Sequence, residues 1–459
     1  MTNEKSERRD KSKVKIILWL ILAAILLAII GLLGSRCERE LPQVTLLGDL
    51  TMVGVKKEIP LKILDAKSGI RRIDAILMQG GKKVKLLAKE FPREGYFGDS
   101  GPHGVDEIIS IDMTPLKMED GSATLSISVQ DYSWWAFMSG NTNTIDYPIT
   151  IDTKPPMVEA ISTPRYIIPG GSGAAFYRVK EAVGKSGVVV NDFFYPGFPL
   201  AGFQDVFVAY IGLPYDTTGL ANSFAMAQDK AGNEGRAAFG MILKKPKFRS
   251  DRINISDNFL QQKMPELLKD SSDKGNTLLD QYLYVNGTMR VENNQRIRDL
   301  CSSPLSTRMW SGIFLRLPHS SPEAGFADHR TYYYQERQID EQVHLGIDLA
   351  SLLHTPALAA NHGIVIFADN LGIYGNTVIL DHGQGLFSLY SHLSEIRVRE
   401  KDEVRQGDTL GLTGTTGMAG GDHLHFAILV NGIFVTPIEW WDEHWLQDNI
   451  LGSMPKKEG

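Results

Sequence analysis

The chain has 459 residues, of which 43% are hydrophobic and 22% are charged, and its formal net charge is −6 at pH 7. This composition is that of an ordinary globular protein, and the length is sufficient for several domains with buried cores. No cluster of basic residues interleaved with aromatic residues occurs outside the N-terminal segment, which argues against nucleic acid as a partner.

The first predicted element is a transmembrane anchor at residues 16–35, preceded by a basic tail at residues 1–15. Every residue from Ile16 to Gly34 is apolar, and about 20 such residues cross the roughly 30 Å hydrocarbon core of a bilayer. The excess of lysine and arginine before Ile16 predicts that the N-terminus lies in the cytoplasm. A cleavable signal peptide is the alternative, but the apolar run is longer than a usual signal core.

Two β-sandwiches in tandem are predicted next, at residues 42–153 and 154–248. Residues 124–129 alternate strictly between polar and apolar types, which is typical of a half-buried strand. Residues 229–233, with the sequence Asp-Lys-Ala-Gly-Asn, resemble the endings of bacterial immunoglobulin-like repeats. We therefore expect immunoglobulin-like sandwiches, with one larger irregular β domain as the alternative.

Residues 249–300 are predicted to form a helical connector. Ser256 and Asp257 are suited to begin a helix, and apolar residues recur at helical spacing over residues 278–283. This connector either links two domains or packs over the domain that follows, and the sequence leaves both possibilities open. At the C-terminus, residues 446–459 are predicted to be a flexible tail.

Two pairs of candidate metal ligands lie in the predicted C-terminal domain, residues 301–445. His423 and His425 are separated by one residue, so on a strand both imidazoles point to the same face. His344 and Asp348 are four residues apart, which also places them on one face of a strand or a helix. One carboxylate and up to three imidazoles can therefore converge, as in a catalytic zinc site with three protein ligands and an open water position.

At the level of motifs, residues 320–440 resemble the lysostaphin-like, LytM-type family of zinc metallopeptidases, which cut peptide bonds in peptidoglycan. The matching motifs, in family order, are His344-x-x-x-Asp348, Tyr390-Ser391-His392-Leu393, the glycine-rich residues 407–417 and His423-Leu424-His425-Phe426. The resemblance implies one zinc ion per chain, held by His344, Asp348 and His425. It also implies that His392 and His423 are the catalytic residues.

The chemistry of this residue set is consistent with hydrolysis. Zinc lowers the pKa of a bound water toward about 7 and polarises a carbonyl group. Imidazole titrates near neutrality, so His392 and His423 can accept and return protons. No His-Glu-x-x-His motif occurs in the sequence, and the histidine pair therefore has the role that a glutamate has in other zinc peptidases.

The sequence thus predicts a mainly β, membrane-anchored zinc metalloendopeptidase that hydrolyses the peptide cross-links of bacterial peptidoglycan. Its expected partners are peptidoglycan stem peptides, the inner membrane and an envelope protein as regulator, with the catalytic domain in the periplasm or cell envelope. The alternatives are a catalytically silent LytM-type activator of another wall hydrolase and a wall-binding scaffold. Such activators typically lack part of the metal set, whereas all five positions are present here.

Cysteine usage excludes a disulfide scaffold, because the chain has only Cys37 and Cys301. Both would lie in an oxidising compartment if the predicted topology holds. The sequence leaves open whether they are paired. Lipoprotein processing at Cys37 is disfavoured, because Arg36 stands where lipoprotein signals have a small residue.

Overall fold

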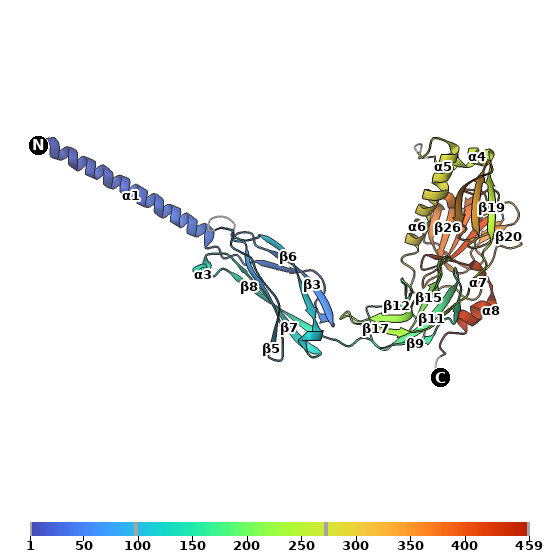
Figure 1. Cartoon of the computed structure of the whole chain (residues 1–459), viewed down its shortest axis with the longest axis horizontal. Helices are drawn as coiled ribbons and strands as arrows, with labels where there is room; N and C mark the ends of the chain where they lie inside the picture. The colour runs from blue at the N-terminus through green and yellow to red at the C-terminus, as the bar shows by residue number, and fades with distance from the viewer. Residues whose placement is uncertain (1, 96–99, 270–273, 457–459) are drawn as a thin grey trace. The chain divides into compact units, whose positions relative to one another are not determined.

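Strands predominate in the fold, as predicted, and a long apolar helix begins the chain (Figure 1). The computed structural model describes residues 2–95, 100–269 and 274–456. These residues form two compact units, of which the first holds residues 1–155 and 229–233.

The first unit contains helix α1 (Thr2–Arg36) and a β-sandwich. Within α1, Lys13–Gly34 is long and apolar enough to cross a membrane. One sheet has the order β1-β3-β6 and the other the order β2-β8-β7-β4-β5. Alternate residues of each strand point between the sheets, so that Ile59, Leu61 and Ile63 of β3 are buried. The bounds are β1 Gln43–Leu46, β2 Met52–Val53, β3 Lys56–Leu64, β4 Ile70–Gln79, β5 Lys82–Glu90, β6 Gly104–Asp112, α2 Met113–Leu116, β7 Gly121–Asp131, α3 Trp135–Met138 and β8 Thr142–Ile151.

The second unit begins with another sandwich, made of two four-stranded sheets. Their orders are β14-β15-β11-β9 and β13-β12-β16-β17, and β10 pairs in parallel with β18 beside them. That both sandwiches are immunoglobulin-like stays a prediction. The bounds are β9 Val158–Ser162, β10 Tyr166–Ile167, β11 Ser172–Val179, β12 Lys185–Val190, β13 Phe193–Pro196, β14 Phe198–Pro199, β15 Val206–Gly212, β16 Ser223–Gln228, β17 Glu234–Ala238 and β18 Ile242–Leu243.

The predicted helical connector starts with a strand, β19 (Ser250–Ile255), which the sequence analysis missed. Its side chains alternate between exposed and partly buried positions, and the strand pairs in parallel with β21. Helices follow, and Ser256 caps the first of them as expected, because its Oγ accepts a hydrogen bond from the backbone N–H of Phe259 at 3.2 Å. The helical bounds are α4 Asp257–Leu267, α5 Leu278–Tyr284, η1 Val285–Met289 and α6 Arg290–Leu300.

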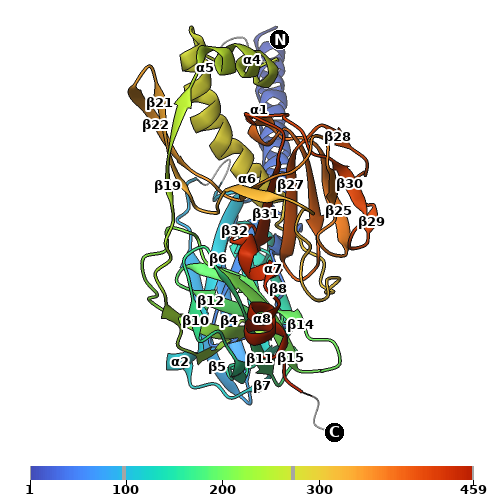
Figure 2. The same cartoon turned by 90° about the vertical axis from the view of Figure 1, so that its right-hand side faces the viewer.

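The C-terminal domain is built on an eight-stranded sheet with the order β20-β23-β31-β27-β26-β25-β29, with β32 also paired to β31. A small sheet, β24-β30-β28, lies beside it, and β19 extends the β21–β22 hairpin. Figure 2 shows α4 and α5 at the same end of this unit as that hairpin. The bounds are β20 Ser321–Ala324, β21 His329–Tyr334, β22 Arg337–Val343, β23 Ile347–Ala350, β24 Pro356–Leu358, β25 Gly363–Asn370, η2 Gly372–Tyr374, β26 Asn376–Asp381, β27 Leu386–Leu393, β28 Glu395–Ile396, β29 Glu403–Val404, β30 Thr409–Leu412, β31 Leu424–Val430, β32 Ile433–Val435, α7 Pro437–Trp441, α8 Glu443–Leu446 and η3 Gln447–Leu451.

The second sandwich and the C-terminal domain share one hydrophobic core. Tyr210 of β15 contacts the rings of Trp310 and Trp440, with centroid distances of 6.1 and 6.4 Å. Ser172 of β11 donates its backbone N–H and its hydroxyl to Glu439 of α7, at 2.7 and 3.0 Å. The second sandwich is therefore packed into the domain that carries the metal-ligand motifs, and is no loosely linked spacer.

This shared core makes the stability of the second unit depend on pH. Burial raises the pKa of Glu439 to about 7, although the two hydrogen bonds from Ser172 oppose the shift. The folded state then holds a proton that the unfolded state releases above its ordinary carboxyl pKa. The free energy of unfolding should fall between roughly pH 4.5 and 7, by at most about 1.4 kcal/mol per pH unit. Glu439→Gln should flatten this dependence in thermal unfolding, whereas Glu443→Gln, at an exposed position of α8, should leave the dependence unchanged. Equal slopes in all three proteins would contradict the assignment.

The prediction of a flexible tail at residues 446–459 is wrong for its first part. Residues 443–451 form helical turns, and the side chains of Leu446 and Ile450 are 1% and 0% exposed. These side chains join the shared core, which gives the segment a reason to stay folded. Residues 457–459 lie outside the described residues.

Both cysteines are free thiols in this structure. Cys301 is buried at the end of α6, and burial raises the pKa of its thiol well above the ordinary range. A buried thiol of this kind behaves as a small hydrophobic side chain and is chemically inert.

Candidate metal centre

The register of three neighbouring strands brings the candidate ligands together. In β23 and β31, Asp348 lies directly opposite His425, and in β27 Ser391 lies opposite the same histidine. Directly opposed residues of an antiparallel pair share a face of the sheet. His344 precedes β23 in the segment that leads from the β22 strand back into the sheet.

Three side chains predicted to bind the metal meet in one cluster. The His344 Nε2 atom lies 2.9 Å from Asp348 Oδ1 and 3.0 Å from His425 Nδ1. The His425 Nδ1 atom is also 2.9 Å from Asp348 Oδ1. All three residues are buried, and one nitrogen or oxygen of each lies within 4.8 Å of the others. Two imidazole nitrogens and one carboxylate oxygen are therefore directed at a single point.

Neighbouring groups hold these side chains in place. The Nδ1 atom of His344 is 2.8 Å from the carbonyl oxygen of Gly325, which orients the ring so that Nε2 faces the cluster. Arg330 of β21 donates from Nη2 to Asp348 Oδ2 at 2.9 Å, which leaves Oδ1 free to face the two histidines. The ring of Tyr374 packs edge-on against His425, with a centroid distance of 5.5 Å.

The predicted catalytic histidines lie beside the cluster. Their rings are 4.8 Å apart, and His423 Nε2 is 3.5 Å from Asp348 Oδ1. The Nδ1 atoms of His392 and His423 each lie 2.8 Å from a backbone carbonyl oxygen, that of Thr416 and that of Gly421. A neutral imidazole that donates from Nδ1 has its lone pair on Nε2, which is the protonation state that a proton acceptor requires.

His392 reaches the site through an unusual backbone conformation. Regular alternation along β27 would send His392 to the face opposite Ser391, and away from His425. Its φ is +64°, in the left-handed region that β-strand residues avoid. Its ring nevertheless lies 5.8 Å from that of His425. Such a conformation costs of the order of 1–3 kcal/mol and is found mainly where function requires it.

The electrostatics of the cluster favour an ionised Asp348 and shift the pKa values of the neighbouring histidines in different directions. Burial alone would raise the pKa of Asp348, but His344 and the hydrogen bonds from His344, His423 and His425 hold it well below its usual value. Burial lowers the pKa of His425 to about 4, against the effect of Asp348. Burial and the two neighbouring histidines likewise hold the pKa of His392 well below its ordinary value. Burial would also lower the pKa of His423, but its contact with Asp348 outweighs this effect and raises it.

The cluster lies in a cleft of about 650 Å³ that the connector helps to form. Strand β19, helix α4 and helix α6 contribute to its wall, together with Arg330 and Tyr332 of the β21–β22 hairpin. Arg290 and Asn294 of α6 face the same cleft. Of the two possibilities that the sequence left open, the connector therefore covers the domain as well as linking it.

Hydrogen bonds join the connector to the two loops beside the cluster. Asn294 Oδ1 accepts from the Tyr374 hydroxyl at 2.7 Å, and Asn293 Oδ1 accepts from the backbone N–H of Ile373 at 2.9 Å. Lys263 of α4 donates to the carbonyl oxygen of Thr415, and Glu266 Oε1 accepts from the backbone N–H of Gly417 at 3.2 Å. Because the loop from Thr415 to Gly417 also supplies the carbonyl that orients His392, the connector is part of the site's support.

One glycine of the first motif makes room for a ligand. A Cβ atom at Gly346 would lie 2.5 Å from both Cε1 and Nε2 of His425 and 2.8 Å from the carbonyl oxygen of Phe426. Gly346→Ala should therefore displace His425, and we expect loss of bound metal and of any turnover with unchanged circular dichroism. Gly420→Ala is the matched control, because Gly420 lines the same cleft and has nothing within 4 Å of its Cβ position. Metal retention in Gly346→Ala equal to that of the control would show that His425 tolerates the displacement.

All five residues predicted from the sequence lie together in this cleft, whereas other parts of its wall were missed. Tyr374, Arg290 and Asn294 carried no motif of their own. The one local signal for Tyr374 was the turn sequence Tyr374-Gly375-Asn376 between two apolar strands. In the structure, Gly375 has a φ of +66° and permits a close approach to Thr416. For the α6 residues the sequence holds no such signal.

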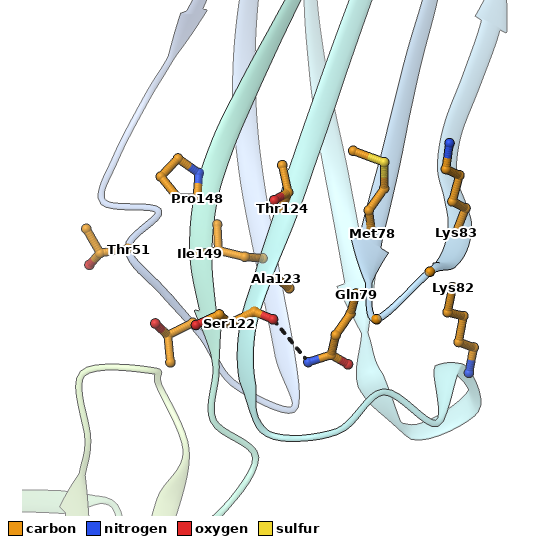
Figure 3. A pocket seen from close by; sticks show the side chains of 13 residues that line it. Thr51, Met78, Gln79, Lys82, Lys83, Ser122, Ala123, Thr124, Pro148 and Ile149 are labelled. Carbon is orange, nitrogen blue, oxygen red and sulfur yellow. Dashed lines mark hydrogen bonds between the residues drawn. The ribbon is translucent and has the colours of Figure 1, made fainter.

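A second cavity, about 730 Å³, lies in the first sandwich and has no comparable chemistry. Figure 3 shows the side chains that line it, including Lys82 and Lys83 next to the Gly80-Gly81 turn. None of the lining residues is a histidine, cysteine, aspartate or glutamate. The side chains that line the cavity therefore offer no imidazole, thiolate or carboxylate to a metal.

Comparison with known proteins places the C-terminal domain in a family. Residues 342–437 match the model of peptidase family M23. Lipoprotein NlpD of Yersinia enterocolitica is 36% identical over 94 residues, which cover 20% of this chain and 96% of that protein. The chain belongs to peptidase family M23.

Two other relatives have enzymatic names. The chain is 39% identical to DD-carboxypeptidase/endopeptidase Mpg of Neisseria meningitidis serogroup B over 97 residues, which cover 21% of this chain and 22% of that protein. It is 34% identical to peptidoglycan DD-endopeptidase ShyA of Vibrio cholerae over 115 residues, which cover 25% of each. The chain thus spans a quarter or less of these relatives' length. A solved structure of a Pseudomonas aeruginosa protein described as a peptidase M23 aligns with 60% of this chain and 95% of its own, at 21% identity and a TM-score of 0.38.

Proposed function

We propose that this protein is a membrane-anchored zinc metalloendopeptidase that hydrolyses the peptide cross-links of bacterial peptidoglycan. The observation that carries the proposal is the convergence of His344, Asp348 and His425, with His392 and His423 beside them in an open cleft. A silent activator or a scaffold would have no need of this complete set. The names of ShyA and Mpg, which describe a peptidoglycan DD-endopeptidase and a DD-carboxypeptidase/endopeptidase, support the substrate class.

The donor set fits zinc better than the other common metals. Two imidazole nitrogens and one carboxylate oxygen match a catalytic zinc site with three protein ligands, whereas Mg²⁺ and Ca²⁺ prefer oxygen ligands alone. The ligand atoms are 2.9 to 3.0 Å apart, which is close enough for all three to reach one small ion. When bound, zinc supplies a Lewis acid and an acidified water. The role of the protein is to hold the ion, orient the peptide and move the protons.

Proton movement is assigned to the two histidines that lie beside the ligands. Each directs Nδ1 at a backbone carbonyl, so that Nε2 of His392 or His423 can take a proton and later deliver it to the leaving amine. The contact of His423 with Asp348 favours its protonated form, which suits it to donate. The strongly lowered pKa of His392 suits it to remain neutral.

The cleft wall also matches the substrate class. Stem peptides carry free carboxylates, and Arg290 faces the cleft, where its guanidinium donates hydrogen bonds to Asn286 and forms no ion pair with a carboxylate of the described residues. An arginine without a carboxylate partner is well suited to receive one from a ligand. We propose that Arg290 pairs with a substrate carboxylate, in cross-links that include D-alanine and a diamino acid.

We further propose that α1 anchors the protein in the inner membrane with its N-terminus in the cytoplasm and the catalytic domain in the periplasm or cell envelope. The apolar span Lys13–Gly34 and the basic residues before Ile16 support this topology. An envelope protein is the expected regulator.

Digestion of purified sacculi tests the proposed activity. The zinc-loaded protein should convert cross-linked muropeptide dimers into monomers with new amino termini, as identified by mass spectrometry. His423→Ala, loaded with zinc in the same way, is the matched control and should release far less product. If the zinc-loaded wild type releases no product alone but accelerates a separate wall hydrolase, the protein is an activator. If it cuts glycan strands instead of peptides, the assigned bond is wrong.

A further inference from the structure

The first sandwich is attached directly to the end of the apolar helix. Helix α1 ends at Arg36, and two residues later the side chain of Glu38 is buried in the sandwich. Glu38 Oε1 accepts hydrogen bonds from Ser68 Oγ at 3.0 Å and from Asn141 Nδ2 at 3.1 Å. One residue, Cys37, thus separates the helix from the sandwich, and this end of the sandwich lies close to the surface of any bilayer that α1 crosses.

A short loop at residues 134–138, the α3 loop, starts at the same point. The backbone N–H of Trp134 donates to the carbonyl oxygen of Arg36 at 2.9 Å. The Ser133 hydroxyl donates to the carbonyl oxygen of Glu38 at 2.7 Å. The Arg39 guanidinium lies over the Trp135 ring, 3.7 Å from its centroid. Figure 1 shows α3 next to the C-terminal end of α1.

The α3 loop exposes apolar side chains in a conformation that ordinary loops avoid. Phe137 is 104% exposed, Met138 59% and Trp135 37%. Ala136, Phe137 and Met138 have φ values of +50°, +58° and +67°, so three consecutive residues with side chains adopt the left-handed region. This region is unfavourable for all residues except glycine. The strained backbone and the exposure of phenylalanine to water are two separate free-energy costs. Insertion of the side chain into an apolar medium would remove the second cost.

We infer that the α3 loop inserts into the interfacial region of the same bilayer that α1 crosses. This inference rests on the proposed membrane anchor. Tryptophan concentrates at the level of the lipid headgroups, with its ring amphipathic, and phenylalanine and methionine can reach the acyl boundary below it. Arg36 and Arg39 lie at the same level and can pair with lipid phosphates. The loop is hydrogen-bonded to the last residue of α1, and this attachment beside the membrane span selects lipid as the occupant over a second protein.

The consequence is that the anchor becomes a two-point attachment. A single helix leaves a domain free to rotate and tilt, whereas a helix and an inserted loop fix the first sandwich against the membrane surface. The sandwich then stands at a set orientation as the base of the envelope-exposed part of the chain.

Site-specific labelling of the full-length chain in vesicles tests this inference. Cys37→Ser and Cys301→Ala remove the native thiols, and an environment-sensitive fluorophore is attached at Phe137→Cys or at Lys83→Cys. Lys83 is the matched control, because it is exposed on β5 and lies at the opposite end of the sheet from the α3 loop. The start of β4 pairs with Asp131, near the α3 loop, whereas the end of β4 pairs with Lys83. The vesicles contain phosphatidylethanolamine and phosphatidylglycerol, with or without brominated acyl chains.

The label at Phe137 should be quenched by brominated lipid and should show severalfold less quenching by aqueous iodide than the label at Lys83. A vesicle-bound chain whose two labels are equally accessible to iodide would refute the inference and leave the proposed anchor intact. Failure of the chain to float with vesicles would refute both. Shielding from iodide that persists in detergent and rises with protein concentration would indicate a second copy as the occupant, which overturns the lipid assignment.

A second variant guards against an effect of the label itself. With Phe137→Ser and Met138→Ser combined, a label at Ser139→Cys should become accessible to iodide, while flotation through α1 is unchanged. If accessibility at Ser139→Cys is the same with and without these two substitutions, their side chains do not insert.

Discussion

Full-length protein carrying His425→Ala should bind no zinc, whereas wild type should retain about one ion per chain after dialysis. His425 is in contact with both His344 and Asp348, and removal of one of three ligands leaves two donors, too few for a catalytic zinc site. Asp348→Asn should also lose the ion, because the site then has no anionic ligand. The measurement is metal content by elemental analysis, with peptidoglycan turnover in parallel, and both should fall to background.

The two variants differ in what else they disturb. Asp348→Asn leaves the partly buried Arg330 without its carboxylate partner, and breaking a fully buried ion pair costs roughly 3–5 kcal/mol, which is an upper bound here. His425→Ala leaves that pair intact and is therefore the cleaner test, with thermal unfolding as the check on folding. His362→Ala is the control, because His362 pairs with Glu403 on the surface of the same domain. Full zinc occupancy in His425→Ala and Asp348→Asn would disprove the ligand assignment.

His392→Ala and His423→Ala should keep the zinc and lose turnover. General acid and base assistance contributes roughly 10²- to 10⁴-fold to a rate, so each variant should be slower by about that factor. If the two histidines act in one proton relay, the double variant should be little slower than the worse single variant, because residues that act as a unit are not additive. The measurement is the initial rate of cross-link cleavage by enzyme with verified zinc content.

His354→Ala is the matched control for this pair. His354 lies close to Asp422, contacts Ser394 and is exposed, so it shares the histidine chemistry without facing the cluster. Its variant should turn over at the wild-type rate. If either His392→Ala or His423→Ala lost metal as completely as His425→Ala, the roles of ligand and proton carrier would have to be exchanged.

Local signals predicted the parts of this protein whose structure depends on nearby residues. The apolar run from Ile16 to Gly34 has one stable state in an apolar medium, a helix. Ser256 caps α4 because a side-chain oxygen satisfies a backbone N–H within the same turn. Likewise, the two-residue period of a strand predicted that the side chains of His423 and His425 point to the same face.

Other features depend on contacts between distant segments and were missed or predicted wrongly. Residues 446–451 lie near the C-terminus, yet Leu446 and Ile450 fold into a core that also contains Tyr210 and Trp310, each more than a hundred residues away. β19 was overlooked because a strand is stable only with a partner, and its partner β21 follows far along the chain. The left-handed backbone of His392 leaves no trace in composition or periodicity.

The sequence by itself predicted the five side chains that we propose do the chemistry, because metal ligands and proton carriers require particular residue types at particular spacings. The tertiary structure alone decided how they meet. The register of β23 against β31 sets Asp348 opposite His425, and the strained φ of His392 turns its ring toward the cluster. The connector closes one wall of the cleft through contacts such as that of Asn294 with Tyr374. Motifs encode chemistry locally, whereas register, strain and enclosure arise only when distant segments pack together.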